Sequence, residues 1–304
     1  MERETAIIEG PAGWGEFASF LEYGPEEASS WLLCALEAAW VGFPRARRQE
    51  IPLNSTVPAI VAKDVRAVLG RYSGTIREVK VKVAERGQTL ADDLARLRAV
   101  REVLPEARLK VDANGGWSES EAVRALVEFE EFELLYAEQP VSTVEGLARV
   151  REQIRARGVS TLIAADESVR KASDPLRVAR LGAADLLIIK AAPLGGVRHA
   201  LSVVEAAGLP AVVSSALETS VGIRVGAALA ASLPQLPYGC GLGTVSLLKG
   251  DVVHDSLVAQ DGVLRIRDVT PDEGLVEHWR AGGERELWWR GRIEQAYLVL
   301  TTGS

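Results

Sequence analysis

A regular series of short apolar runs, each ending in a charged residue, is the strongest constraint on how this chain folds. Asp112 ends the run R-L-K-V-D, Glu138 ends L-L-Y-A-E, Asp166 ends L-I-A-A-D, and Lys190 ends D-L-L-I-I-K. From Lys82 onward the run ends lie 24–30 residues apart. One strand, one loop and one helix of ordinary length fill about that many residues. The spacing therefore predicts alternating strands and helices, with ionisable groups at the C-terminal ends of the strands.

The alternation continues through seven repeats and predicts a parallel α/β fold. In a closed parallel barrel the C-terminal strand ends meet at one mouth, where barrel enzymes carry their active sites. A doubly wound open sheet is the rival, but it gathers its site at one switch point and not along five consecutive strands. We therefore expect a modified TIM barrel, (β/α)7β, with an eighth strand from residues 54–59 or from the region after Val245. The expected strands are residues 79–83, 109–112, 134–138, 162–166, 186–190, 211–215 and about 238–241.

The N-terminal part predicts a small α+β capping domain. Residues 5–9 and 14–17 are predicted strands on either side of a Gly-Pro turn. A helix is expected to begin at Gly24-Pro25, because Pro is favoured in the first helical turn, and to run to Trp40. Its two tryptophans, Trp31 and Trp40, are interpreted as core residues.

The repeat stops after residue 250. Residues 252–266 predict a bulged strand pair around residues 260–262, and residues 285–298 predict an amphipathic terminal helix that packs back on the N-terminal part. The predicted division is a capping domain over residues 1–57, a barrel over residues 58–250, and a C-terminal segment over residues 251–304 that returns to the capping domain.

Composition narrows the classes of partner. The formal net charge is −7 with both signs interspersed, which argues against nucleic acid and anionic membrane as partners. Cys34 and Cys240 stand far apart in unlike contexts and are interpreted as two thiols in a reducing compartment. An N-terminal basic-apolar signal and a membrane-length apolar run are both missing from the sequence, so the expected location is cytoplasmic. The sequence leaves monomer and homo-oligomer open.

The three strand-end carboxylates, Asp112, Glu138 and Asp166, predict a metal site. Three ionised carboxylates at one mouth repel one another unless a cation lies between them. Oxygen ligands without His or Cys suit Mg²⁺ or Mn²⁺ rather than zinc. Asn114, two residues after Asp112, is expected to support the metal ligands by hydrogen bonding. The three histidines, at positions 199, 254 and 278, are not at predicted strand ends and are expected elsewhere.

The lysines predict the chemistry beside this site. Lys80 and Lys82 are two residues apart, so they lie on one face of a strand, and Lys190 follows the carboxylates in barrel order. A lysine that is partly neutral can remove a proton from carbon, and a metal on an adjacent substrate carboxylate would hold the resulting enolate. We therefore expect metal-assisted proton abstraction next to a carboxylate.

Each of these features alone has a plainer interpretation. A single strand-end acid is more often a helix N-cap or a loop acid than a metal ligand, and Lys-x-Lys on a strand is usually a solvated edge. Asp112-Ala-Asn-Gly is also a turn signal. The joint occurrence of these residues, in step with the repeat, favours the functional interpretation.

At this point the residues resemble a known family. The chain is similar to the enolase superfamily, in the branch with a Lys-x-Lys motif like the muconate-lactonising enzymes, and within it to the o-succinylbenzoate synthase family of actinobacterial type. The resemblance covers about residues 5–295. It is carried by V-K-V-K-V (79–83), V-D-A-N-G-G-W (111–117), E-Q-P (138–140), A-D-E-S (165–168), I-I-K (188–190), V-S-S-A-L-E-T-S-V-G (213–222) and C-G-L-G-T (240–244).

The resemblance implies a capping domain on a (β/α)7β barrel and a Mg²⁺ ion held by Asp112, Glu138 and Asp166. Glu167 is not among the implied ligands. It also implies that Lys82 is the base, and then the acid that helps hydroxide leave in a syn elimination through an enediolate. The dehydration implied is that of 2-succinyl-6-hydroxy-2,4-cyclohexadiene-1-carboxylate to o-succinylbenzoate, a step toward menaquinone.

By the same resemblance Lys190 would stabilise the enediolate from the opposite face, and Lys80 would support Lys82 and the substrate carboxylate. Backbone groups around Ser214, Ser215 and Gly241 would hold the succinyl end of the substrate. The chain departs from the family in two respects. It is expected to begin at the family's second strand, without the first strand and a mobile loop, and it has Ser19 where the family commonly has Pro.

Three other functions remain open at the level of sequence. An N-succinylamino acid racemase, or another racemase or cycloisomerase of the superfamily, would use the same residues. A Schiff-base aldolase would use Lys190 without a metal, and borohydride trapping in the presence of EDTA would identify it. A non-catalytic barrel would bind a ligand without turnover.

Overall fold

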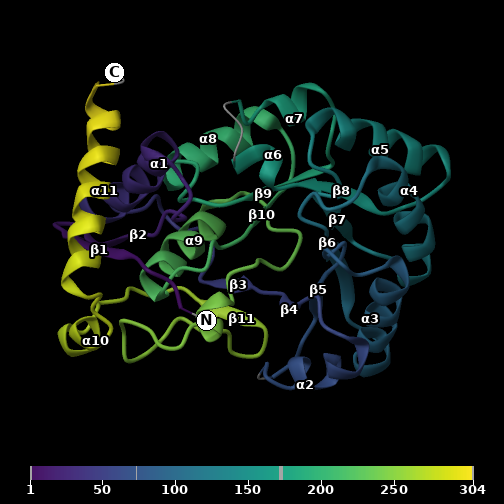
Figure 1. Ribbon diagram of the computed structural model, residues 1–304, viewed down its shortest axis with the longest axis horizontal. Coiled ribbons are helices and arrows are strands. Elements are labelled where there is room, and N and C mark those ends of the chain that lie inside the picture. Colours follow the sequence, from purple (N-terminus) through teal and green to yellow (C-terminus); the bar gives the residue numbers. More distant parts are fainter. Residues whose placement is uncertain (1, 73, 171–173, 303–304) are drawn as a thin grey trace.

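The structure is a computed structural model that describes residues 2–72, 74–170 and 174–302. Seven parallel strands form a curved sheet in the order β10-β9-β8-β7-β6-β5-β4, with helices on its outer side (Figure 1). In the described part of the chain, a helix long and apolar enough to cross a membrane is not found. The strands are β4 (Ser55–Val57), β5 (Glu78–Lys82), β6 (Arg108–Asp112), β7 (Tyr136–Glu138), β8 (Leu162–Ala165), β9 (Leu186–Ile189) and β10 (Ala211–Val213).

The segment around Cys240 closes this sheet into a barrel. Parallel bridges join Leu53 to Cys240 on one side and Ser214 to Gly241 on the other. The amide of Cys240 donates to the carbonyl of Pro52 at 2.7 Å, and the amide of Gly241 donates to the carbonyl of Val213 at 2.9 Å. The eighth strand is therefore the first of the two expected alternatives, since β4 falls within residues 54–59. The expected modified TIM barrel is confirmed.

Helices follow the strands and cover the outside of the barrel. Two of them, α3 and α4, begin with reciprocal capping, in which Thr89 or Ser118 accepts from an amide three residues on and an acid reaches back. Short 3-10 turns cover residues 62–64, 129–132 and 244–247. The helices on this side are α2 (Val65–Leu69), α3 (Leu90–Val103), α4 (Glu119–Glu128), α5 (Val144–Ala156), α6 (Glu167–Arg170), α7 (Arg177–Arg180), α8 (Val197–Ala207) and α9 (Ser220–Ser232).

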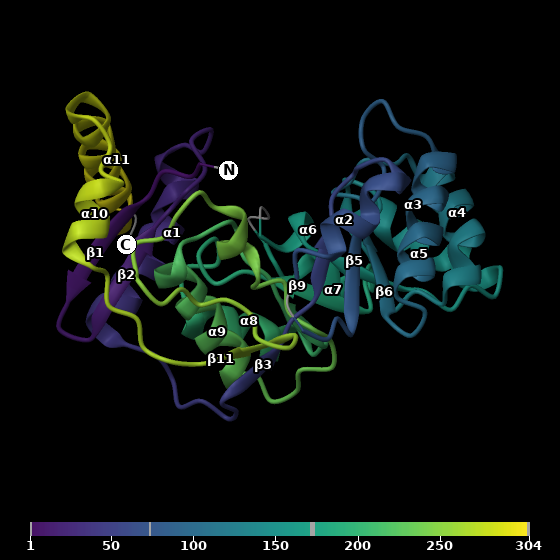
Figure 2. The same ribbon diagram turned by 90° about the horizontal axis from the view of Figure 1, so that it is seen from below.

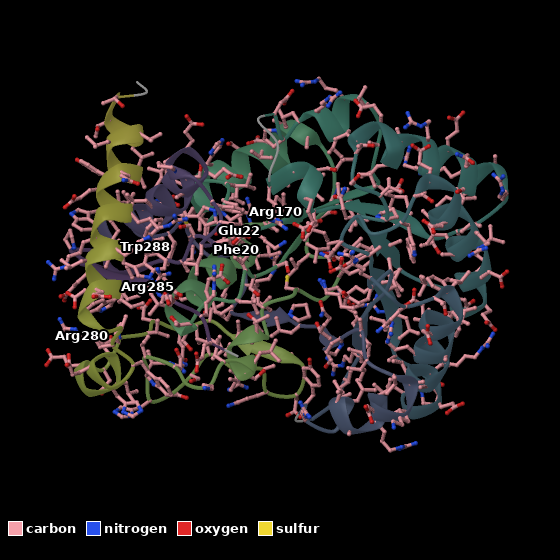
Figure 3. All side chains as sticks on the ribbon, in the orientation of Figure 1. Phe20, Glu22, Arg170, Arg280, Arg285 and Trp288 are labelled. Carbon is pink, nitrogen blue, oxygen red and sulfur yellow. The ribbon has the colours of Figure 1, made fainter. Side chains whose placement is uncertain are left out.

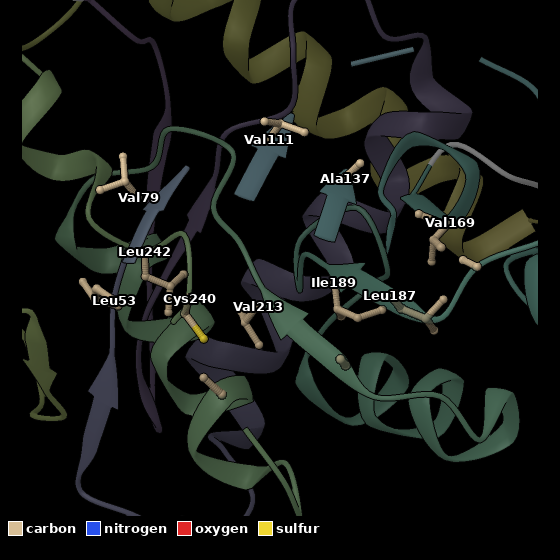
Figure 4. Packing of buried hydrophobic residues seen from close by; sticks show 14 of the residues in the cluster. Leu53, Val79, Val111, Ala137, Val169, Leu187, Ile189, Val213, Cys240 and Leu242 are labelled. Carbon is tan, nitrogen blue, oxygen red and sulfur yellow. The ribbon is translucent and has the colours of Figure 1, made fainter. Parts of the chain in front are cut away.

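Alternation along the strands separates the main core from the barrel interior. Val79, Val111 and Ile189 belong to the core that packs between the sheet and the outer helices (Figure 4). Their strand neighbours face inward, and Tyr136 and Ile188 belong to a separate interior cluster. The same period of two directs the charged residues of β5, β6 and β7 to the inside of the barrel.

The two ends of the chain form a second layer beside the barrel. Strands β1 (Ala6–Gly10) and β2 (Gly13–Phe17) pair as an antiparallel hairpin. Helices α1 (Pro25–Leu36) and α11 (Gly283–Thr302) pack together, at the opposite end of the molecule from α4 and α5 (Figures 1 and 2). The short helix α10 (Glu273–His278) precedes α11. Cys34 and Cys240 are buried free thiols.

Two expectations about these ends are wrong. Trp40 is 50% exposed, whereas Trp31 is 1% exposed. After Leu36 the helix continues as a π-helix, Glu37–Val41, and its wider hydrogen-bond spacing turns Trp40 away from the core. Residues 252–259 are irregular, so the expected strand pair within residues 252–266 is reduced to a single antiparallel bridge between Gln260 and Val263.

Strand β11 (Val263–Arg265) pairs with β3 (Glu50–Pro52). A distant strand therefore competes successfully with the local partner that the sequence suggested. The division into residues 1–57, 58–250 and 251–304 stays a prediction, and these ranges include residues outside the described part of the chain.

Candidate active site

Strand register brings the predicted residues to one end of the barrel. Lys82 on β5 is paired with Asp112 on β6, Asp112 with Glu138 on β7, and Glu138 with Ala164 on β8. Asp166 lies two residues beyond Ala164 and therefore projects from the same face. Lys190 follows β9 directly. The carboxyl ends of five consecutive strands thus carry charged side chains to the same mouth.

Lys82 and Lys190 lie on opposite sides of this mouth. In the sheet, β6, β7 and β8 lie between β5 and β9. The seven strands and the closing segment at Cys240 and Gly241 make up an eight-membered barrel wall. Members four places apart in such a wall, such as β5 and β9, face each other across the barrel. Lys82 and Lys190 therefore approach the carboxylates from opposite directions.

These side chains line a pocket of about 370 Å³. It contains every residue that the sequence proposed for the site: Lys80, Lys82, Asp112, Asn114, Glu138, Asp166, Lys190, Ser214, Ser215 and Gly241. Ser214 and Gly241 are bridged to each other at the barrel closure, and the Ser215 hydroxyl is 2.8 Å from that of Thr244. The residues suggested for the metal, the base and the substrate therefore share one cavity.

Lysine amines hold the three buried carboxylates. The Nζ of Lys80 donates to Asp112 at 3.1 Å and to Glu138 at 3.3 Å. The Nζ of Lys82 donates to Asp112 at 2.6 Å, and the Nζ of Lys190 donates to Asp166 at 2.5 Å. The three acids are 1–2% exposed, so their charges are shielded little by solvent.

The pKa values in this cluster are displaced in different directions. Burial, followed by repulsion from Asp112, raises the pKa of Glu138 to about 7. Burial opposes ionisation of Asp112 as well, but Lys80 and Lys82 together lower its pKa. Burial also opposes the charge of Lys80, yet Glu138 and Asp112 raise its pKa. The cluster therefore keeps Asp112 as an anion, whereas the charge on Glu138 depends on how much positive charge lies beside it.

The donor set suits a hard divalent cation. Asp112 and Glu138 already converge on one positive nitrogen, that of Lys80, and their oxygen atoms are the ligands that Mg²⁺ and Mn²⁺ prefer. Among the described residues, three His, Cys, Asp or Glu side chains grouped closely enough to hold an ion are not found. The Lys80 amine lies between Asp112 and Glu138, and the Lys190 amine contacts Asp166, so all three acids already face positive charge.

The neighbours of these ligands are ordered by hydrogen bonds. Asn114 accepts from Lys82 at 2.5 Å and donates to Glu167 at 3.2 Å. Glu167 also accepts from Arg170 at 2.8 Å, so this acid is directed toward Arg170. The histidines lie elsewhere in the described chain: His199 is in α8, His254 is 3.3 Å from Asp272, and His278 ends α10.

Sequence reasoning missed several residues of the pocket, and Arg170 is the most informative of them. Its guanidinium donates to Asp166 at 3.2 Å and to the hydroxyl of Tyr23 at 3.0 Å. Arg170 and Phe20 lie in the middle of the molecule, where the N-terminal layer meets the barrel mouth (Figure 3). The i, i+4 spacing from Asp166 was a signal that could have identified Arg170. Phe20, Asn54, Thr56, Tyr72 and Leu247 also line the pocket.

Comparison with known proteins gives the family of this chain. Residues 61–275 match the family described as enolase C-terminal domain-like, and residues 1–39 match the one described as enolase N-terminal domain-like. The chain is 50% identical over 299 residues to the o-succinylbenzoate synthase of Mycolicibacterium smegmatis, covering 98% of this chain and 90% of that one. It is 49% identical to the o-succinylbenzoate synthase of Mycobacterium leprae, covering 98% and 87% of the two chains.

Solved structures agree on the fold. The muconate cycloisomerase of Pseudomonas fluorescens superimposes with a TM-score of 0.75 at 22% identity, over 92% of this chain and 98% of that one. The muconate lactonizing enzyme of Pseudomonas putida gives a TM-score of 0.74 at 23% identity, over 90% and 92% of the two chains.

Proposed function

This chain belongs to the enolase superfamily, in the family of o-succinylbenzoate synthases, and from that premise we propose how its pocket works. It is a lyase that dehydrates 2-succinyl-6-hydroxy-2,4-cyclohexadiene-1-carboxylate to o-succinylbenzoate, a step toward menaquinone. The observation that carries the mechanism is that Lys82 and Lys190 lie on opposite sides of the barrel mouth, with the buried carboxylates between them.

Lys82 carries the proton transfers in this proposal. As a free amine it takes the proton from the ring carbon that bears the carboxylate, and the negative charge spreads onto that carboxylate as an enediolate. The Lys82 ammonium then gives the proton to the hydroxyl on the same face of the ring, and water leaves. One residue acting twice on one face accounts for a syn elimination.

Lys190 and Lys80 supply fixed positive charge around this step. Lys190 faces Lys82 across the pocket and stabilises the charge that develops on the substrate carboxylate. Lys80, on the same face of β5 as Lys82, supports Lys82 and the substrate carboxylate with its positive charge. Ser214, Ser215 and Gly241 lie at the barrel closure and receive the succinyl end of the substrate.

Enzymes of the enolase superfamily generally use a divalent metal ion, and Mg²⁺ is our proposal for this chain. Asp112, Glu138 and Asp166 would hold it. Asn114 would orient Asp112 and Lys82 through its hydrogen bonds to both side chains. When bound, the ion supplies Lewis-acid stabilisation of the substrate carboxylate. The expected cytoplasmic location stays a prediction, as does the oligomeric state.

Replacement of Lys82 tests the proposal. In Lys82→Ala the dehydration rate should fall by about 10²–10⁴-fold, which is the usual contribution of a general base. The measurement is the absorbance change on formation of the aromatic product with purified protein and added Mg²⁺. Lys63→Ala, at an exposed lysine, should leave the rate unchanged. Dehydration that survives in Lys82→Ala would contradict the assignment.

The same two lysines also favour a racemase, since amines on opposite faces of a carbon can exchange one proton. The candidate substrate class is the N-succinylamino acids. Catalytic efficiencies of the wild-type protein with both substrates separate the two functions. We expect dehydration to be the more efficient reaction, and equal efficiencies would overturn that ranking.

A further inference from the structure

We propose that Arg96 is a positioning residue for Lys82. The pairing of β4 with β5 ends just before Lys82, and hydrogen bonds from Arg96, Gln88 and Asp93 take its place. These hydrogen bonds set the backbone position from which the Lys82 amine reaches the substrate. The inference deepens the proposed function and rests on it for the role of Lys82.

The sheet is incomplete on one side of Lys82. The described pairing of β4 with β5 ends at Val57 opposite Val81, one residue before Lys82. Pro58 follows, and the chain turns there, since the amide of Ile60 donates to the carbonyl of Pro58 at 2.8 Å. On the other side β6 continues, with Lys82 opposite Asp112. The last residue of β5 is therefore held by a strand on one flank only.

The guanidinium of Arg96 fills the open flank. Its Nη1 donates to the carbonyl of Lys82 at 2.8 Å, and its Nε donates to the carbonyl of Ile60 at 2.7 Å. Its Nη2 donates to the side-chain oxygen of Gln88, whose Nε2 donates to the carbonyl of Ala59 at 2.7 Å. One side chain thus bridges the end of β5 and the loop after β4, where a strand would otherwise bridge them.

Asp93 extends the same network to the loop after β5. It accepts from Arg96 Nη1 at 2.8 Å and from the amide of Ala84 at 3.1 Å. Ala84 has φ 60°, a left-handed conformation that non-glycine residues adopt only where the surroundings impose it. Because Ala84 comes two residues after Lys82, Asp93 fixes the chain immediately beyond the base.

This arrangement needs an arginine. Arg96 and Asp93 are each 1% exposed, so the pair is a fully buried network within helix α3. A lysine keeps the charge but has a single donor nitrogen, and it cannot reach the four acceptors that the planar guanidinium of Arg96 contacts. The Lys82 side chain is 31% exposed and meets Asp112 and Asn114, both from the β6 side. Its backbone is the part that Arg96 controls.

Arg96→Lys is the decisive variant, and Arg98→Lys is its control on the same helix. Arg98 is exposed and pairs with Glu131 at the surface. We expect kcat for dehydration to fall at least about tenfold in Arg96→Lys with KM within about twofold, because a base displaced by a fraction of an ångström loses alignment but not substrate binding. Substrate deuterated at the carbon that loses the proton should show a larger isotope effect on kcat. Arg98→Lys should match the wild type in all three quantities.

A merely structural role would give a different pattern. In that case kcat would fall only in proportion to the folded fraction, measured by circular dichroism, and the isotope effect would stay unchanged. That result would overturn the inference. If Arg96→Lys does not fold, Gln88→Leu removes the contact to Ala59 at a partly exposed position. It should lower kcat by about two- to fivefold with the same rise in isotope effect, and an unchanged isotope effect would likewise reject the inference.

The outcome for the proposed function can be distinguished from this one. Dehydration by the wild type and its loss in Lys82→Ala establish the role of Lys82, whatever the Arg96 variant does. Should the wild type not dehydrate the substrate, a crystal structure of Arg96→Lys still decides the inference. A displaced Lys82 backbone supports it, and an unmoved Lys82 with its amine in place rejects it.

Discussion

At the scale of single residues, two buried acids, Glu16 and Glu218, lie where the N-terminal layer meets the barrel. Glu16 on β2 accepts from the amide of Thr219 at 3.1 Å and from the amide of Gly222 at 2.8 Å, at the start of α9. Glu218 accepts from the amide of Ala216 at 2.7 Å. Burial, followed by the charge of Glu16, raises the pKa of Glu218 from 4.5 to about 7. Burial raises the pKa of Glu16 as well.

This raised pKa predicts how stability changes with pH. The folded protein binds the Glu218 proton more tightly than the unfolded chain does, so the associated stability is complete below about pH 4.5 and is lost as pH rises through about 7. Glu218→Gln removes this loss. Its Tm relative to wild type should therefore rise by about 3 °C or more between pH 5 and pH 8 in calorimetry. Glu27→Gln, at an exposed position, should give a flat difference, and a flat difference for Glu218→Gln would refute the prediction.

At the scale of elements, helix α11 attaches to the rest of the molecule through one of two adjacent tryptophans. Trp289 is 5% exposed, and its ring meets that of Phe17 edge-on at 5.7 Å. Its indole N–H donates to Glu4 at 2.8 Å. Trp288 is 38% exposed and stacks with Arg285, whose guanidinium lies 3.9 Å from its ring centre (Figure 3). The two residues share a helix but differ in burial.

Replacement of each tryptophan by alanine separates these environments. Trp289→Ala should lower the free energy of unfolding by about 3–5 kcal/mol, since it empties a packed site and removes the indole N–H that donates to Glu4. Trp288→Ala should cost about 1 kcal/mol or less, because it removes surface stacking. Urea unfolding followed by fluorescence measures both. Equal losses in the two variants would mean that α11 is not anchored through Trp289.

At the scale of the whole molecule, the interior of the barrel holds buried charges of both signs. Beneath the pocket, the Lys110 amine donates to Glu78 at 3.1 Å and to the carbonyl of Gly239 at 2.7 Å. Burial lowers the pKa of Lys110, although Glu78 opposes that change. The pocket above adds three carboxylates from three strands. The folded state therefore gathers charges that the unfolded chain keeps apart, and a cation that binds them should stabilise the entire fold.

Metal addition tests this statement on the whole molecule. With Mg²⁺ at about 100 times its dissociation constant, binding to the folded state alone adds about 2.7 kcal/mol, so Tm should rise by several degrees. EDTA should reverse the rise and abolish dehydration. NaCl at equal ionic strength is the control and should not raise Tm comparably. If neither Tm nor the dehydration rate changes on addition of Mg²⁺ or EDTA, metal binding at Asp112, Glu138 and Asp166 is contradicted.

The features that sequence alone determined are those encoded within one strand or one helix. The apolar alternation of residues 79–83 and the repeat spacing predicted the barrel, and placed Lys82, Asp112 and Lys190 at one mouth. This succeeded because a parallel barrel aligns all its C-terminal strand ends, so position in the repeat translates directly into position in space.

Tertiary structure decided what depends on contacts between distant segments. The closure at Cys240 joins strands that precede and follow the whole repeat, and β11 takes the distant strand β3 as its partner in place of the nearer residues 252–259. Arg96 acquires its role only when the chain brings Ile60 and Lys82 to the same guanidinium. Local patterns do not carry such information, because the free energy of these contacts belongs to groups that become neighbours only in the folded chain.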